Sequence, residues 1–116
     1  PSKRGYPKIG SLLKILTKRI KMGDSVEFCF NLNNYNTEKR TIRLEYGIYY
    51  RKMNGEMTRK VYKISEKEYK GNSITEVNRK HSFRPITTRT FYPGIHQIAV
   101  IFNGCESGKC EFELVE

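Results

Sequence analysis

Residues 81–96 read His-Ser-Phe-Arg-Pro-Ile-Thr-Thr-Arg-Thr-Phe-Tyr-Pro-Gly-Ile-His, and this run of extended and turn-forming residues indicates the fold. Pro85 and Pro93 each fix φ and remove a backbone donor, so the stretch cannot be one helix. The threonines between them favour extended backbone. Tyr92-Pro93-Gly94 is typical of a type II turn, with Tyr92 placed to hydrogen-bond across the corner of a β-sandwich. The stretch is therefore predicted to be strand, loop, turn and strand.

The same stretch is basic. No carboxylate occurs from Val77 through Cys105, so nothing within that span neutralises its cationic side chains. A cationic loop stiffened by two prolines suits an anionic partner, and phosphate is the group we expect it to contact. The candidate contact residues are Arg79, Lys80, His81, Arg84, Arg89 and His96.

Apolar and polar residues alternate on both sides of this stretch, which predicts strands. Alternation begins at Ser25, and Asn54-Gly55 is the strongest hairpin signal in the chain. A later alternating segment contains Ile98, Val100 and Phe102 and stops at Asn103-Gly104. We count seven or eight antiparallel strands without a helical crossover, which predicts an all-β, immunoglobulin-like β-sandwich. The expected core residues are Phe28, Phe30, Leu44, Tyr46, Ile98, Val100, Phe102, Phe112 and Leu114.

The N-terminal residues allow two interpretations. Residues 1–8 are basic and interrupted by Gly5 and Pro7, which is typical of a linker or arm, so the sandwich is expected over residues 9–116. The apolar residues of Ile9–Met22 would fit one face of a helix. However, the segment leads directly into Gly23 and an alternating strand, so strand is the preferred prediction.

The three cysteines are Cys29, Cys105 and Cys110, an odd number without CxxC spacing. This pattern favours reduced thiols over a disulfide framework or a zinc site. Cys105 and Cys110 flank residues 106–109, which we interpret as a four-residue hairpin loop. A bridge between them across two strands is the alternative.

Length and charge limit the class of protein. The 116 residues are enough for one domain, and the net charge of +10 favours nucleic acid first and an acidic membrane surface second as partner. A soluble basic domain without an anionic partner is the alternative. No apolar run approaches the roughly 20 residues of a membrane span, and no secretory signal is present, so a cytoplasmic protein is expected. Because the chain opens at Pro1, we expect it to be a piece of a longer protein.

A catalytic constellation is not recognisable. The lone aspartate, Asp24, adjoins Gly23 in an expected turn, and the glycines after position 90 are isolated turn residues that do not form a phosphate loop. His81 and His96 flank the central loop and could meet as a metal or general-base pair, but a polar role at strand ends is preferred. We therefore expect no enzyme activity, metal or cofactor within this chain.

Four segments resemble a known family. They are residues 80–89 (Lys-His-Ser-Phe-Arg-Pro-Ile-Thr-Thr-Arg), 91–96 (Phe-Tyr-Pro-Gly-Ile-His), 46–55 (Tyr-Gly-Ile-Tyr-Tyr-Arg-Lys-Met-Asn-Gly) and 59–64 (Arg-Lys-Val-Tyr-Lys-Ile). Together they resemble the C-terminal immunoglobulin-like domain of bacterial AlkC-type DNA alkylation repair proteins, a DNA glycosylase family, over about residues 23–116.

The resemblance implies a parent protein in which a HEAT-like helical repeat domain excises alkylated bases while the sandwich holds double-stranded DNA. The catalytic carboxylates would lie in the helical domain, so none transfers to this chain. Thr90, Ile95 and Gln97 are neutral where the family is more basic, which weakens the expected grip of the loop. The alternative is a structural module that packs against the helical domain without touching DNA. A monomer is expected in either case.

Overall fold

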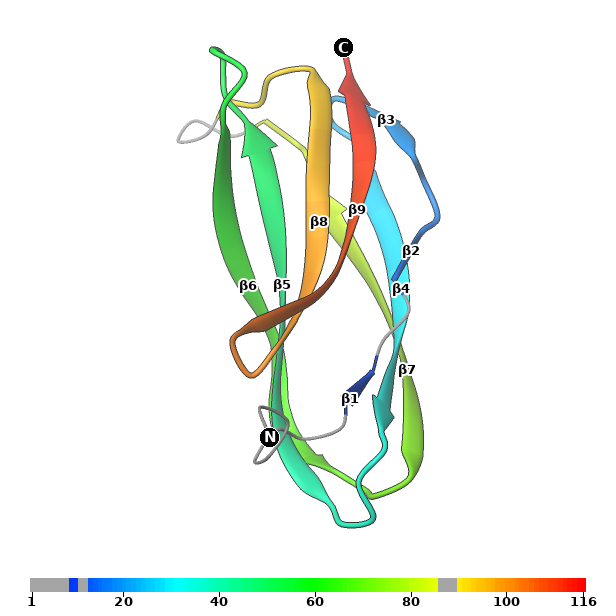
Figure 1. The fold of residues 1–116 in the computed structure, drawn as a ribbon. Coiled ribbons are helices and arrows are strands. Elements are labelled where there is room, and N and C mark those ends of the chain that lie inside the picture. The colour runs from blue at the N-terminus through cyan, green and yellow to red at the C-terminus, as the bar shows by residue number, and fades with distance from the viewer. Residues whose placement is uncertain (1–8, 11–12, 86–89) are drawn as a thin grey trace.

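The computed structural model describes residues 9–10, 13–85 and 90–116, and this part of the chain consists of strands and their connections (Figure 1). The predicted arm (residues 1–8) and Arg89 lie outside the described residues. Within the described ranges, no helix could cross a membrane. The strands are β1 (Ile9–Gly10), β2 (Lys14–Ile15), β3 (Arg19–Lys21), β4 (Ser25–Asn34), β5 (Arg40–Arg51), β6 (Met57–Tyr69), β7 (Ser73–Ser82), β8 (Gly94–Phe102) and β9 (Cys105–Val115).

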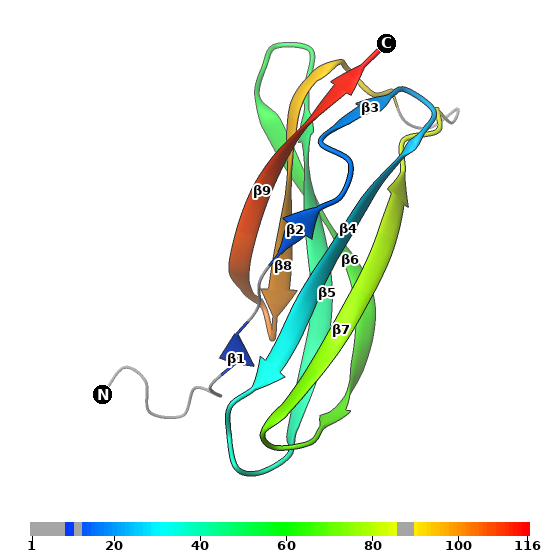
Figure 2. The same ribbon diagram turned by 90° about the vertical axis from the view of Figure 1, so that its right-hand side faces the viewer.

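The strands form two sheets. In the smaller sheet, β4 pairs with β7 and with both β1 and β2, and in the larger the order is β3-β9-β8-β5-β6 (Figure 2). β1 and β2 follow β4 in a single register, with Ile9 opposite Asn34 and Ile15 opposite Phe28, so they act as one interrupted strand. The described residues thus hold eight strands. The predicted immunoglobulin-like sandwich is confirmed.

One strand pair departs from the expected antiparallel arrangement. β3 pairs with β9 in parallel, with Ile20 opposite Leu114. The cause is the path of the N-terminal segment, which leaves the small sheet after β2 and continues in the same direction along the large sheet. At this crossing Leu16 is 60% exposed, while Ile20 is buried beyond it. The prediction of strand for Ile9–Met22 is confirmed where the structure describes this segment. Its first two strands join the small sheet and β3 joins the large one.

The last hairpin differs from the sequence prediction. Its turn is Asn103-Gly104, where both residues have positive φ (49° and 87°), as a two-residue turn requires. β9 then runs without a break through residues 106–109, so the predicted four-residue hairpin there is wrong. Cys105 faces Phe102 and Cys110 faces Ile98 across the ladder, and all three thiols are free.

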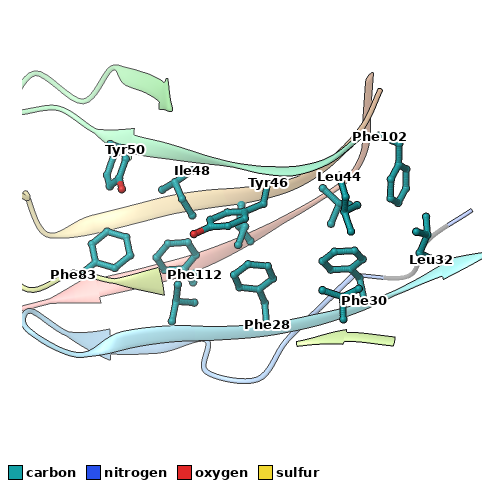
Figure 3. Packing of buried hydrophobic residues seen from close by; sticks show 14 of the residues in the cluster. Phe28, Phe30, Leu32, Leu44, Tyr46, Ile48, Tyr50, Phe83, Phe102 and Phe112 are labelled. Atoms are coloured by element: carbon teal, nitrogen blue, oxygen red, sulfur yellow. The ribbon is translucent and has the colours of Figure 1, made fainter. Parts of the chain in front are cut away.

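The core lies between the sheets. Every core residue expected from the sequence is at most 8% exposed, and Figure 3 shows rings from both sheets pointing toward one another. Phe28 of β4 meets Tyr46 of β5 edge-on at 5.1 Å between centroids. Burial of each such side chain contributes roughly 1.5–3 kcal/mol.

The end of the sandwich that holds the β4–β5 and β6–β7 connections is closed by one buried amide. The side chain of Asn34 is 1% exposed. Its Nδ2 donates to the carbonyl oxygens of Glu38 (3.3 Å), Tyr69 (3.1 Å) and Lys70 (3.0 Å). Its Oδ1 accepts from the backbone and side-chain nitrogens of Asn36. Asn34 therefore joins two connections that are far apart in sequence.

Candidate nucleic-acid interface

The loop between β7 and β8 lies at the opposite end of the sandwich and is anchored at both sides by aromatic rings. Phe83 directly follows β7, and Phe91 lies shortly before β8. Both are buried, and their ring centroids are 5.1 Å apart. Tyr50, near the end of β5, contacts both at 5.8 and 5.7 Å. The loop thus leaves and re-enters the domain at fixed points.

Gly94 shows why the turn into β8 needs glycine. Its φ is 130°, in the region that favours glycine. A Cβ at this position would lie 2.5 Å from Cδ of Arg51. The stem of Arg51 therefore crosses the start of β8 and links it to the end of β5. The side chain of Tyr92 before this turn is half-buried, and its corner hydrogen bond stays a prediction.

His96 does not face a partner, so its assignment as a contact residue is wrong. Its side chain is 0% exposed and lies among the rings of Tyr50, Phe83 and Phe112. Nδ1 lies 3.1 Å from the carbonyl oxygen of Gly94, which can only accept, so Nδ1 carries the proton. Nε2 is buried without a hydrogen-bond partner in the described residues. Burial lowers the pKa of His96, and the nearby charge of Arg51 adds to this effect.

A pH dependence of stability follows. Because the folded state binds a proton at His96 less readily than the unfolded chain, the free energy of unfolding should fall as pH drops below about 6.5. Above that pH, the imidazole is neutral in both states and the effect vanishes. Chemical denaturation at about pH 7.5 and about pH 5 should show a smaller loss for His96→Phe than for the natural chain. An equal loss in both proteins would contradict this assignment.

His81 also faces inward. Its Nδ1 lies 3.0 Å from the hydroxyl of Tyr46, and its Nε2 lies 2.6 Å from that of Tyr50. The Tyr50 hydroxyl is also 2.7 Å from the hydroxyl of Tyr62 on β6. Both ring nitrogens therefore serve a network that ties β7 to the large sheet, and His81 is not available as a phosphate contact. Burial raises the pKa of Tyr46, and its neighbour Tyr62 adds to the shift.

The remaining candidates that the structure describes, Arg79, Lys80 and Arg84, are exposed, but only some of them are free of ion pairs. Lys80 Nζ lies 3.3 Å from a carboxylate oxygen of Glu27. Neither Arg79 nor Arg84 takes part in an ion pair among the described residues. Arg79 is opposite the inward-facing Phe28 in register, yet it is exposed at the free edge of β7. Arg84 follows β7, and its backbone nitrogen donates to Ser82 Oγ at 3.1 Å.

The outer face of the large sheet is neutralised by contrast. Glu106 accepts from Tyr49 Oη and from Arg59, whose Nη1 is 2.7 Å away. Lys109 Nζ lies 4.3 Å from the centre of the Tyr49 ring. The hydrogen bond from Tyr49, followed by the one from Arg59, lowers the pKa of Glu106. This face therefore offers less free positive charge than the end that holds Arg84.

The sequence did not predict that the β5–β6 hairpin lies at the same end of the sandwich as the basic residues around Arg84. Tyr50 contacts Phe83 and Phe91, and Arg51 lies against Gly94, so the hairpin tip lies at the end of the sandwich where β7 ends and β8 begins (Figure 1). The tip carries the exposed residues Lys52 and Met53. A signal was present, since Asn54-Gly55 marks a hairpin turn and turns lie at the protein surface. In the described part of the chain, no cluster of His, Cys, Asp or Glu could hold a metal ion.

The two-sheet topology defines an immunoglobulin-like domain. The chain belongs to the family described as "Uncharacterised protein YhaZ, C-terminal Ig-like domain", whose model matches residues 11–116. It is 37% identical to the protein YhaZ of Bacillus subtilis over 97 residues, which are 84% of this chain and 27% of the relative.

Solved structures agree with this assignment. The Pseudomonas fluorescens alkylpurine DNA glycosylase AlkC, bound to DNA containing an abasic site analog, matches with a TM-score of 0.91 and 27% identity. That match covers 95% of this chain and 31% of AlkC, which confirms the expected resemblance. A β-glucosidase from Listeria innocua is 12% identical with a TM-score of 0.72, over 96% of this chain and 16% of that one, which shows the fold alone. The chain spans less than a third of the length of YhaZ and of AlkC.

Proposed function

We propose that this domain is the non-catalytic, DNA-contacting part of a DNA alkylation repair glycosylase and holds the phosphate backbone near the lesion. The observation that carries the proposal is the pair Arg79 and Arg84. Both are exposed, neither is paired with a carboxylate in the described residues, and both lie in a span without acidic residues. The likeness to AlkC, which was solved with DNA, supports it.

The role follows from the chemistry of these groups. A guanidinium group donates two parallel hydrogen bonds to phosphate oxygens and fixes position without reading sequence. The domain would hold double-stranded DNA while a HEAT-like helical domain of the same parent carries out base excision. The cytoplasm, where bacterial DNA lies, is the compartment that this role requires.

Salt dependence tests the proposal. The double variant Arg79→Ala/Arg84→Ala should bind duplex DNA more weakly than the natural chain. The slope of log K against log[salt] should become shallower by about 0.9 for each phosphate that the variant no longer neutralises. Fluorescence anisotropy of a labelled duplex across a salt series measures both quantities.

The matched control removes the same charge from the opposite end. Lys67→Ala/Lys70→Ala takes two exposed cations from the end of β6 and the β6–β7 connection, and neither forms an ion pair among the described residues. This variant should keep the natural slope. If the two double variants reduce the slope equally, binding depends on net charge alone and the proposed interface is wrong.

A packing module is the second candidate, and one observation favours it. The outer side of the small sheet leaves Leu16 and Ile74 60% and 74% exposed. NMR shift mapping separates the two functions. DNA should perturb residues 79–96 if the first is right, whereas only an added helical fragment should perturb the chain if the second is right.

A further inference from the structure

One edge of β7 has no partner strand. In the described part of the chain, β7 pairs with β4 alone, along its whole length of 10 residues from Ser73 to Ser82 (Figure 2). An unpaired edge presents a row of backbone N–H and C=O groups to which a further strand can bind. The free edge of β7 is therefore long enough to hold an extended peptide.

The neighbouring strand of the large sheet is not fully covered. The large sheet has five strands, whereas the small sheet is three strands wide because β1 and β2 act as one. Tyr62 and Ile64 of β6 pack against the core but are only half-buried. The ring centroids of Tyr62 and His81, which is near the end of β7, are 4.7 Å apart. A strand added to β7 would therefore lie against the uncovered side of β6.

Two cations without ion pairs border this uncovered side. Arg79 on β7 is opposite the buried Phe28, and Lys60 on β6 is opposite the buried Ile48, so both belong to the inner sides of their strands. Both are exposed, and neither forms an ion pair among the described residues. Inward-pointing charges on an edge strand oppose pairing with an apolar strand.

These charges indicate which kind of strand fits. The net charge of +10 opposes pairing with a second copy of this chain. A strand that carries carboxylates would instead neutralise Arg79 and Lys60. Its apolar side chains would cover Tyr62 and Ile64 and remove their exposed surface from water.

We propose that the free edge of β7 binds an extended acidic segment of a protein partner as an additional antiparallel strand. Backbone hydrogen bonds to β7 would supply affinity, and the alternate side chains of the segment would supply specificity. This inference goes beyond the proposed function and does not depend on it, because the partner is a protein and the contacts follow a sheet edge.

A synthetic peptide of about nine residues, alternating valine and glutamate with both ends blocked, tests the proposal because its length matches that of β7. Fluorescence anisotropy of the labelled peptide should rise and saturate as the natural chain is added. Amide hydrogen exchange followed by NMR should show that alternate amides of β7, those that face away from β4, exchange more slowly in the complex. Absence of binding, or protection along β6 in place of β7, would overturn the proposal.

Backbone methylation separates strand pairing from charge attraction. The N–H groups of alternate residues in a strand point toward the same edge, so methylating the nitrogens of the glutamates blocks one edge of the peptide and methylating those of the valines blocks the other. Both methylated peptides keep every carboxylate. One should lose at least about tenfold in affinity, and the other should bind like the parent peptide. Equal affinities of the two would contradict strand addition.

A charge reversal in the protein tests the acidic character of the partner. Lys60→Glu should weaken binding of the parent peptide about three- to tenfold. Lys14→Glu is the matched control, because Lys14 is also exposed and without an ion pair among the described residues but lies on β2, on the other side of β4 from β7. This variant should bind like the natural chain. An equal loss in both variants would mean that net charge alone attracts the peptide, and the proposal would be wrong.

Discussion

Phe83→Ala should lower the free energy of unfolding by about 3–5 kcal/mol, the cost of removing a large ring from a packed core. Phe83 is 0% exposed and contacts Tyr50, Phe91, His96 and Phe112. Little can move in to fill the space, since these neighbours are themselves held between two sheets. Urea denaturation followed by circular dichroism measures the loss.

The same change should affect DNA binding, because Phe83 anchors one side of the basic loop. As a typical domain has only about 5–15 kcal/mol of stability, Phe83→Leu is the variant for binding experiments. It should remain folded and should weaken binding without changing the salt slope, because the phosphate contacts persist in a less fixed geometry. A loss of stability below about 1 kcal/mol for Phe83→Ala would show that the rings do not form one packed cluster.

Asn34→Ala should cost about 2–4 kcal/mol of unfolding free energy. The substitution removes five hydrogen bonds and leaves the carbonyl groups of Tyr69 and Lys70 without this partner. The penalty is larger than for one hydrogen bond because the site is buried and a methyl group cannot replace the amide.

Asn31→Ala is the control for this prediction. Asn31 lies on the same strand as Asn34 but on its outer, half-buried side. Its replacement should change stability by less than about 0.5 kcal/mol. Similar losses for the two variants would mean that the end of the sandwich is not held together by the Asn34 amide.

The orientation of β4 could be predicted because one side of the strand is buried and the other is not. The alternation of apolar and polar residues from Val26 to Leu32 therefore shows which side chains face the core. The turn at Asn54-Gly55 could be predicted because few residues other than glycine adopt positive φ. The parallel pairing of β3 with β9 could not be predicted, since no residue near Ile20 indicates which sheet this segment joins. Residues 106–109 resemble a turn, but Asn103-Gly104 had already reversed the chain.

The histidine positions could have been predicted better than they were. His96 has the same parity as the core residues Ile98 and Val100, and His81 has that of Val77, so alternation puts both on the inner side of their strands. Arg79 shares the parity of His81 but is exposed at the free edge of β7. By contrast, the pairing of Lys80 with Glu27 depends on which strands are neighbours, and this emerges only from the folded sheet. The sequence alone therefore predicts more cationic side chains without an ion pair than the folded domain has.

The parallel pairing of β3 with β9 has a mechanical consequence. β1 and the C-terminus lie toward opposite ends of the sandwich (Figure 1). Tension between the two chain ends would therefore pull β3 and β9 in opposite directions along their length and load their hydrogen bonds in shear, all at once. A domain whose terminal strands are loaded in shear should need a high force to unfold and should then unfold in a single step.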